Sequence, residues 1–178
     1  MGEAAPAGAF PPGSPFDPAD DAAFARWRDA KLAARARSAA DLVVEVRDPR
    51  SLGPAERDEL VRRCRRDNMA LYASAATGED KEIARRLGAQ LGLATLDANF
   101  LADEDGITSI AVTDRKAGAG YIPYTTHRLR WHTDGYYNPP RLRIRAMLLH
   151  CVRDAAAGGE TALLDHELAY LLLREEDP

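Results

Sequence analysis

Cysteine, histidine and long apolar runs are scarce in this chain of 178 residues, and each scarcity excludes a class of protein. The two cysteines, Cys64 and Cys151, lack the spacing of a metal-binding motif, so reduced, partly buried thiols are expected. No apolar run is long enough to span a bilayer. Residues 1–18 have neither the basic start nor the apolar segment of a secretory signal. We therefore expect a cytoplasmic protein with no membrane partner.

The chain has no large excess of either charge, because 29% of its residues are charged but the net charge is only −4. A chain that is not basic lacks a general surface for nucleic acid, so no nucleic-acid partner is expected. The arginine-rich segment 62–66 falls at the C-terminal end of a predicted helix, where cations complement the helix dipole. A solvated helix end therefore explains this segment better than a phosphate-binding patch does.

The motif that carries chemistry is His132-Thr133-Asp134. In an extended segment, side chains two residues apart point to the same face, so His132 and Asp134 can reach one metal ion. With a second histidine they would form the two-histidine, one-carboxylate triad of non-haem Fe(II) oxygenases, which leaves coordination sites open. A hydrogen-bonded surface turn is the alternative explanation of this short motif.

Further motifs surround this one in a fixed order. They are Tyr124-Thr125-Thr126, the aromatic Trp131 directly before His132, Pro139-Pro140, Leu149-His150-Cys151 and Gly158-Gly159-Glu160-Thr161. With this set, the chain resembles the taurine dioxygenase / γ-butyrobetaine hydroxylase family of Fe(II)- and 2-oxoglutarate-dependent oxygenases. The likeness runs from residue 121 to residue 165, and more loosely back to residue 41.

The resemblance implies that O₂ hydroxylates a small organic substrate, with Fe(II) as the metal and 2-oxoglutarate as the cosubstrate. It makes His132 and Asp134 the metal ligands, with no other catalytic residue predicted. Thr161 matches the position whose hydroxyl donates to 2-oxoglutarate, although threonine is also an ordinary strand residue. The glycines Gly158 and Gly159 are expected to form a tight turn with positive φ that positions Thr161.

Substrate contacts are expected from aromatic and amide side chains around the metal motif. Tyr124 stands where the hydroxylase has a tyrosine of its cationic-substrate cage, and a core aromatic is an equally good explanation. The other candidates are Tyr136, Tyr137 and Asn138 after the motif, and Asp97 and Asn99 in an upstream loop. Trp131 is expected to pack beneath the metal-binding strand.

The sequence departs from the family pattern after the metal motif. The family needs a second histidine well downstream and an arginine that grips 2-oxoglutarate, but only His150 and His166 follow His132. Neither has the separation that the family shows. We therefore expect an N-terminal part of an oxygenase. The alternatives are a non-catalytic remnant, a structural partner that completes another chain's roll, or a metal-dependent cupin hydrolase or isomerase.

The expected fold class is α+β, a double-stranded β-helix (jelly roll) with flanking helices that is incomplete at the C-terminus. Residues 1–19 are expected to be a flexible lead-in, and residues 20–178 the helices and first strands of the roll. Unpaired strand edges would favour a homo-oligomer or a complementing chain. The hydrophobic pattern predicts helices over 20–40, from Pro54 to the arginines, from a Thr77 cap to Gly92, and over 167–175 after an Asp165 cap. It predicts strands over 41–46, 69–73, 107–113 and 143–152.

Overall fold

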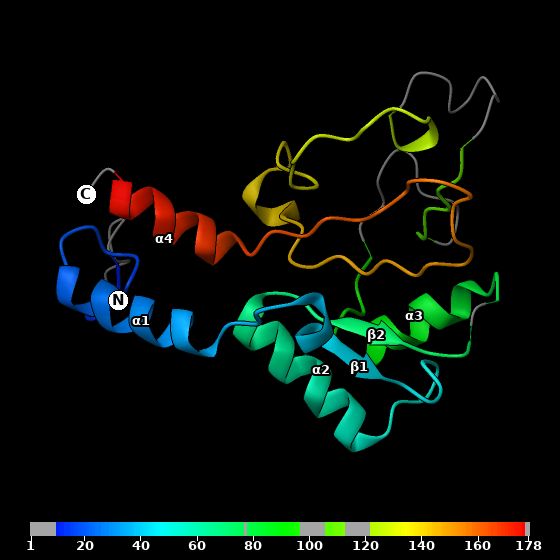
Figure 1. Cartoon of the computed structure of the whole chain (residues 1–178), viewed down its shortest axis with the longest axis horizontal. Helices are drawn as coiled ribbons and strands as arrows, with labels where there is room; N and C mark the ends of the chain where they lie inside the picture. Colours follow the sequence, from blue (N-terminus) through cyan, green and yellow to red (C-terminus); the bar gives the residue numbers. More distant parts are fainter. Residues whose placement is uncertain (1–9, 77, 97–105, 113–121, 177–178) are drawn as a thin grey trace, which may run out of the picture. The chain divides into compact units, whose positions relative to one another are not determined.

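The computed structural model describes residues 10–76, 78–96, 106–112 and 122–176. The chain divides into two compact units (Figure 1). The first unit contains residues 1–48, 52–76 and 153–178, and the second contains residues 49–51 and 77–152. The second unit is thus an insertion in the sequence of the first. None of the described helices has the length and apolar character that a membrane crossing requires.

The first unit contains a parallel β-α-β arrangement. Strand β1 (Val43–Glu45) pairs with β2 (Leu71–Ala73), and helix α2 (Pro54–Asp67) connects them. Pro54 occupies the first turn of α2, where its missing N–H costs nothing. Glu56 reaches back to the backbone N–H of Gly53 at 2.6 Å. The predicted strands 41–46 and 69–73 and the predicted helix are therefore confirmed in kind, with shorter strands.

Helix α1 (Asp21–Ala34) ends six residues before the predicted end of its helix. The backbone N–H of Ala36 donates to Asp67 Oδ1 at 2.8 Å, which takes it away from a helical partner. Asp41 accepts hydrogen bonds from the N–H groups of Arg37 and Ser38. These bonds cap the start of the 3₁₀ helix η1 (Ala39–Leu42), whose third residue is Asp41. A contact with a distant residue therefore decides where this helix stops.

Helix α4 (His166–Glu176) packs beside α1 in the first unit (Figure 1). As predicted, Asp165 caps α4, because its Oδ1 accepts from the N–H of Glu167 at 3.0 Å. Phe16, in the predicted lead-in, lies 5.3 Å from Tyr170 and 5.5 Å from Trp27 between ring centroids. An aromatic cluster thus joins the chain before α1 to both helices.

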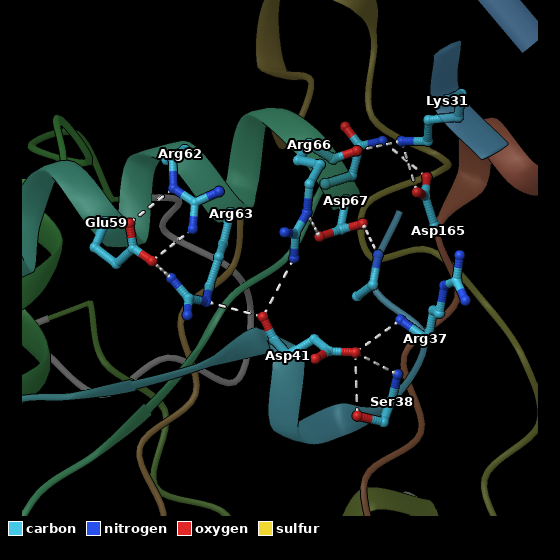
Figure 2. A network of polar contacts seen from close by, with 12 residues as sticks. Lys31, Arg37, Ser38, Asp41, Glu59, Arg62, Arg63, Arg66, Asp67 and Asp165 are labelled. Atoms are coloured by element: carbon cyan, nitrogen blue, oxygen red, sulfur yellow. Dashed lines mark hydrogen bonds and ion pairs between the residues drawn. The ribbon is translucent and has the colours of Figure 1, made fainter. Parts of the chain in front are cut away.

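A buried charged cluster fixes the start of α4 to α1 and to the end of α2 (Figure 2). Lys31 Nζ lies 2.7 Å from Asp165 Oδ2 and 2.5 Å from Glu167 Oε2, and it donates to the Arg66 carbonyl at 2.7 Å. Burial lowers the pKa of Lys31, but the hydrogen bonds to the two carboxylates outweigh it and raise this pKa above its usual value. We call these residues the Lys31 cluster. It is the buried ionic centre of the first unit.

Helix α3 (Lys81–Gln90) is the largest element of the second unit. Its predicted apolar stripe is confirmed, because Ile83 and Leu87 are fully buried and Gly92 follows with φ +86°. Asp80 caps the helix by accepting from the Glu82 N–H at 3.0 Å. The predicted cap Thr77 lies outside the described residues.

The strands predicted over 107–113 and 143–152 are wrong for the described residues. Residues 107–112 and 143–152 form neither helix nor strand. Residue 113 lies outside the description. Exposure still alternates over residues 143–145, as in an extended segment, but a strand requires hydrogen bonds to a neighbour. The α+β class is confirmed. The described sheet has two parallel strands, so a complete jelly roll stays a prediction.

Candidate metal centre

His132 and Asp134 lie in the second unit, between the 3₁₀ helices η2 (Ile122–Tyr124) and η3 (Pro140–Leu142). The prediction of a strand at this motif is wrong, because residues 130–134 form neither helix nor strand. The side chains nevertheless approach each other, with His132 Nε2 3.4 Å from Asp134 Oδ1. Both are partly exposed, at 44% and 43% of the side chain. Solvent and small molecules can therefore reach the pair.

The distance between the two atoms suits a shared metal ion. Nitrogen and oxygen ligands lie about 2.1 Å from a metal such as zinc, so two ligands at right angles are about 3 Å apart. His132 Nδ1 lies 2.8 Å from the Arg130 carbonyl oxygen. Since a carbonyl can only accept, Nδ1 carries the proton and Nε2 of a neutral ring presents its lone pair towards Asp134. Metal-binding histidines usually have such an orienting acceptor.

A tight turn holds Asp134 in place. Gly135 has φ +64°, and its carbonyl accepts from the Asn138 N–H at 2.9 Å. A Cβ built at Gly135 would lie 2.6 Å from Ile144 Cδ1, closer than atoms can approach. Asn138 Nδ2 donates to the Leu142 carbonyl at 3.0 Å. The turn therefore needs glycine at position 135, and Leu142 and Ile144 contact the turn that follows Asp134.

Within the described residues, no group of three histidine, cysteine, aspartate or glutamate side chains is placed to hold a metal ion. His150 is half-buried in the second unit, and His166 begins α4 in the first. Among the described residues, two side chains of the expected triad therefore lie together.

The predicted substrate contacts have different surroundings. Tyr136 and Tyr137 are 80% and 74% exposed and meet edge to face, with ring centroids 5.3 Å apart. Tyr124 is half-buried in η2, and half-buried Asn138 already serves the turn. Trp131 is 66% exposed, so its predicted packing beneath a strand is wrong. Asp97 and Asn99 lie outside the described residues.

Thr161 belongs to the first unit and is exposed. The preceding glycines have the predicted positive φ, +69° at Gly158 and +81° at Gly159. The predicted positive φ of both glycines is thus confirmed, and their role in positioning Thr161 stays a prediction. Because His132 belongs to the other unit, the role of Thr161 in binding 2-oxoglutarate stays a prediction.

The segment around the pair is rich in arginine, which the motif analysis did not consider. Arg128 and Arg130 precede the pair, and Arg141, Arg143 and Arg145 follow it, all exposed. The only acidic residue from 122 to 152 is Asp134.

Comparison with known proteins identifies the family. The family model described as "Taurine catabolism dioxygenase TauD, TfdA family" matches residues 28–178. The chain belongs to this family. The TauD-family match covers both units, including the His132-Thr133-Asp134 motif and the Lys31 cluster, so the resemblance inferred from the motifs is confirmed.

One curated protein that is similar to part of the chain is named for a nucleotide. A uridine-5'-phosphate dioxygenase from a Streptomyces species is 40% identical over 77 residues, which are 43% of this chain and 27% of that protein. The match thus spans about a quarter of the relative's length. No solved structure matches the chain.

Proposed function

We propose that this chain provides the His-x-Asp part of an Fe(II)- and 2-oxoglutarate-dependent oxygenase that hydroxylates a small organic substrate. The observation that carries the proposal is the 3.4 Å approach of His132 Nε2 to Asp134 Oδ1, with Nδ1 oriented by the Arg130 carbonyl. Membership of a dioxygenase family supports it.

The bound metal would supply open coordination sites for 2-oxoglutarate and O₂. The chain's own contribution is to hold two ligand atoms on one side and to leave the other side accessible. The Arg130 carbonyl fixes the ring of His132, and the Gly135 turn fixes Asp134. The half-exposed position of the pair is consistent with ligand entry from solvent.

The cosubstrate and substrate contacts form the second part of the proposal. Thr161 would donate its hydroxyl hydrogen to a carboxylate of 2-oxoglutarate. Tyr136 and Tyr137, on the turn that follows Asp134, present exposed aromatic surface beside the metal ligands. The Streptomyces relative is named for uridine 5'-phosphate, which supports a substrate that combines an aromatic ring with a phosphate. Tyr124 and Asn138 remain candidate contacts.

The alternative function is non-catalytic: a remnant, or a structural chain that completes another chain's fold. The two-ligand set supports this alternative, because a metal site with two protein ligands binds weakly. Metal binding separates the two proposals, since only the oxygenase needs an ion at His132 and Asp134.

The test titrates Co(II) or Mn(II) into the protein under anaerobic conditions and measures succinate release with Fe(II), 2-oxoglutarate and ascorbate under air. The oxygenase proposal expects weak metal binding that His132→Ala and Asp134→Ala each remove. His127→Ala is the matched control, because His127 is an exposed histidine of the same segment. We expect little succinate from this two-ligand chain and robust release once a distal histidine and arginine are supplied. Equal metal affinity in all four proteins would overturn the proposal.

A further inference from the structure

The two candidate metal ligands are held in different ways. The ring of His132 is oriented directly, because its Nδ1 lies 2.8 Å from the Arg130 carbonyl oxygen. Among the described residues, the Asp134 carboxylate makes a single polar contact, the 3.4 Å approach of Oδ1 to His132 Nε2. No hydrogen-bond donor of the described residues therefore orients this carboxylate, and its position depends on the backbone of its own segment.

Asn138 ties that backbone at two points. Its main-chain N–H donates to the Gly135 carbonyl at 2.9 Å, which closes the turn directly after Asp134. Its side-chain Nδ2 donates to the Leu142 carbonyl at 3.0 Å, at the last residue of η3. One residue thus links the turn that follows the carboxylate to the next 3₁₀ helix.

The segment that accepts the side-chain bond is itself stiff. Pro139 precedes η3 and Pro140 is its first residue, and a proline ring fixes its own φ. The Leu142 N–H donates to the Pro139 carbonyl at 2.8 Å. Because the acceptor belongs to a short, internally hydrogen-bonded segment, the bond from Asn138 restricts the turn.

Close packing accompanies these two hydrogen bonds. A Cβ built at Gly135 would lie 2.9 Å from Asn138 Nδ2 and 2.6 Å from Ile144 Cδ1. The amide of Asn138 and the side chain of Ile144 therefore both pack against the backbone of the residue next to Asp134. Asn138 is half-buried, whereas the two tyrosines before it are 80% and 74% exposed.

We propose that Asn138 is a positioning residue, whose side-chain amide holds the Asp134 carboxylate beside His132. This role is additional to the substrate contact predicted for Asn138, and it acts before any substrate arrives. Its chemical consequence rests on the proposed function, because a carboxylate that moves away from His132 cannot share a metal ion with it. Substitution of groups that orient metal ligands typically lowers metal affinity about 10–100-fold.

The first measurement is made without metal, on the full 178-residue chain. Asn138→Leu keeps the main-chain N–H and a side chain of similar size but has no amide donor, and Asn138→Ala is the second variant. Nuclear magnetic resonance measures the nuclear Overhauser effect between the His132 ring protons and the Asp134 β protons, together with hydrogen exchange. In both variants this effect should fall by at least half, and exchange at the main-chain amide of residue 138 should accelerate. Exchange in α3 should stay unchanged, since α3 belongs to the same unit and would report its general loosening.

The second measurement is the affinity for Co(II) or Mn(II) under anaerobic conditions. We expect Asn138→Leu and Asn138→Ala each to lower it about tenfold or more. Thr126→Val is the matched control, because Thr126 is an exposed residue of the same unit and its hydroxyl bonds to none of the described residues. This control should keep the wild-type metal affinity and the wild-type contact between His132 and Asp134.

Several results would overturn the inference. They are an unchanged contact between His132 and Asp134 in Asn138→Leu, equal and measurable metal affinity in the wild-type protein and both variants, and equal losses in Thr126→Val. Exchange that accelerates as much in α3 as at residue 138 would also overturn it. A wild-type protein without this contact would refute both proposals. A wild-type protein that binds no metal, but whose contact between His132 and Asp134 depends on Asn138, would refute the oxygenase proposal alone.

Discussion

The two units of this chain differ in whether they bury charged side chains. In the first unit, Lys31, Asp67 and Asp165 are buried with partners, and apolar side chains such as Phe24, Val44 and Leu60 form a core. The described buried side chains of the second unit, such as Ile83 and Leu87 of α3, are apolar. Both units expose large apolar side chains, among them Leu173 in the first and Leu149 in the second. The comparison teaches that most of the described helices and strands lie in one unit, whereas the His132–Asp134 pair lies in the other.

The difference follows from hydrogen bonding. The first unit satisfies its backbone in helices and a paired sheet, so its side chains can interlock. Residues 143–152 form no strand in the described part of the chain. Met147 and Leu149 of this segment are exposed, and contiguous exposed apolar surface marks a site of interaction.

Removing the charge at the centre of the Lys31 cluster should give the largest effect. Lys31→Met leaves Asp165 and Glu167 without their buried cation, and breaking a buried pair in this way costs about 3–5 kcal/mol. We expect that loss in the free energy of unfolding, measured by urea denaturation. Hydrogen exchange should show that the loss is greatest in α1, α2 and α4.

Arg28→Gln is the matched control for Lys31→Met. Arg28 pairs with Asp29 and Glu175 at the surface of the same helix, and exposed pairs contribute roughly 0–1 kcal/mol. Equal losses in the two variants would show that the Lys31 cluster does not distinguish the first unit energetically.

Gly135→Ala should act on the second unit alone. A residue with a side chain at positive φ costs about 1–3 kcal/mol, and the new Cβ would also collide with Ile144. We expect faster hydrogen exchange at the Asn138 amide and weaker metal binding. The control is Gly78→Ala, where a Cβ meets nothing within 4 Å. If exchange at Asn138 is unchanged, the turn does not constrain Asp134.

Asp165 should contribute to the pH dependence of stability of the first unit. Burial raises the pKa of Asp165, but Lys31 and Asn68 outweigh it and hold this pKa below its usual value. A depressed carboxyl pKa stabilises the folded state above about pH 4, and this stability is lost as the pH falls through the folded value. We expect unfolding free energy to fall below pH 4, and to fall less steeply in Asp165→Asn. The same slope in both proteins would assign the acid sensitivity to other carboxylates.

The smallest effect is expected from Leu149→Gln, because Leu149 is 50% exposed. Surface substitutions usually change stability by no more than about 0.5 kcal/mol. Self-association should decrease, however, since apolar surface is removed, and sedimentation measures it. A loss of several kcal/mol would mean that Leu149 is buried in solution.

The helices could be predicted because their signals are local. Pro54 at a first turn, Asp165 as a cap and the Ile83–Leu87 stripe each act within a few residues. The sequence patterns over 107–113 and 143–152 were not enough to predict strands correctly, because a strand forms only beside a hydrogen-bonded neighbour. The same limit explains the early end of α1, which a hydrogen bond to Asp67 decides.

The candidate site could be predicted in part. The i, i+2 spacing correctly brought His132 and Asp134 together, although the backbone there is not a strand. The packing of Gly135 on Ile144 is a contact between residues nine apart, and no local pattern predicts it.

The Lys31 cluster has a consequence for how the protein is made. Lys31 and Glu167 are 136 residues apart in the sequence, and bacterial and eukaryotic ribosomes add about 5–20 residues each second. For roughly ten seconds, therefore, helix α1 has been synthesised and α4 has not. During this time the Lys31 amine is exposed to water, and the aromatic side chains of α1 are uncovered. The whole second unit emerges during this interval. The first unit can close only afterwards, so a chaperone that shields α1 would have its greatest effect before α4 leaves the ribosome.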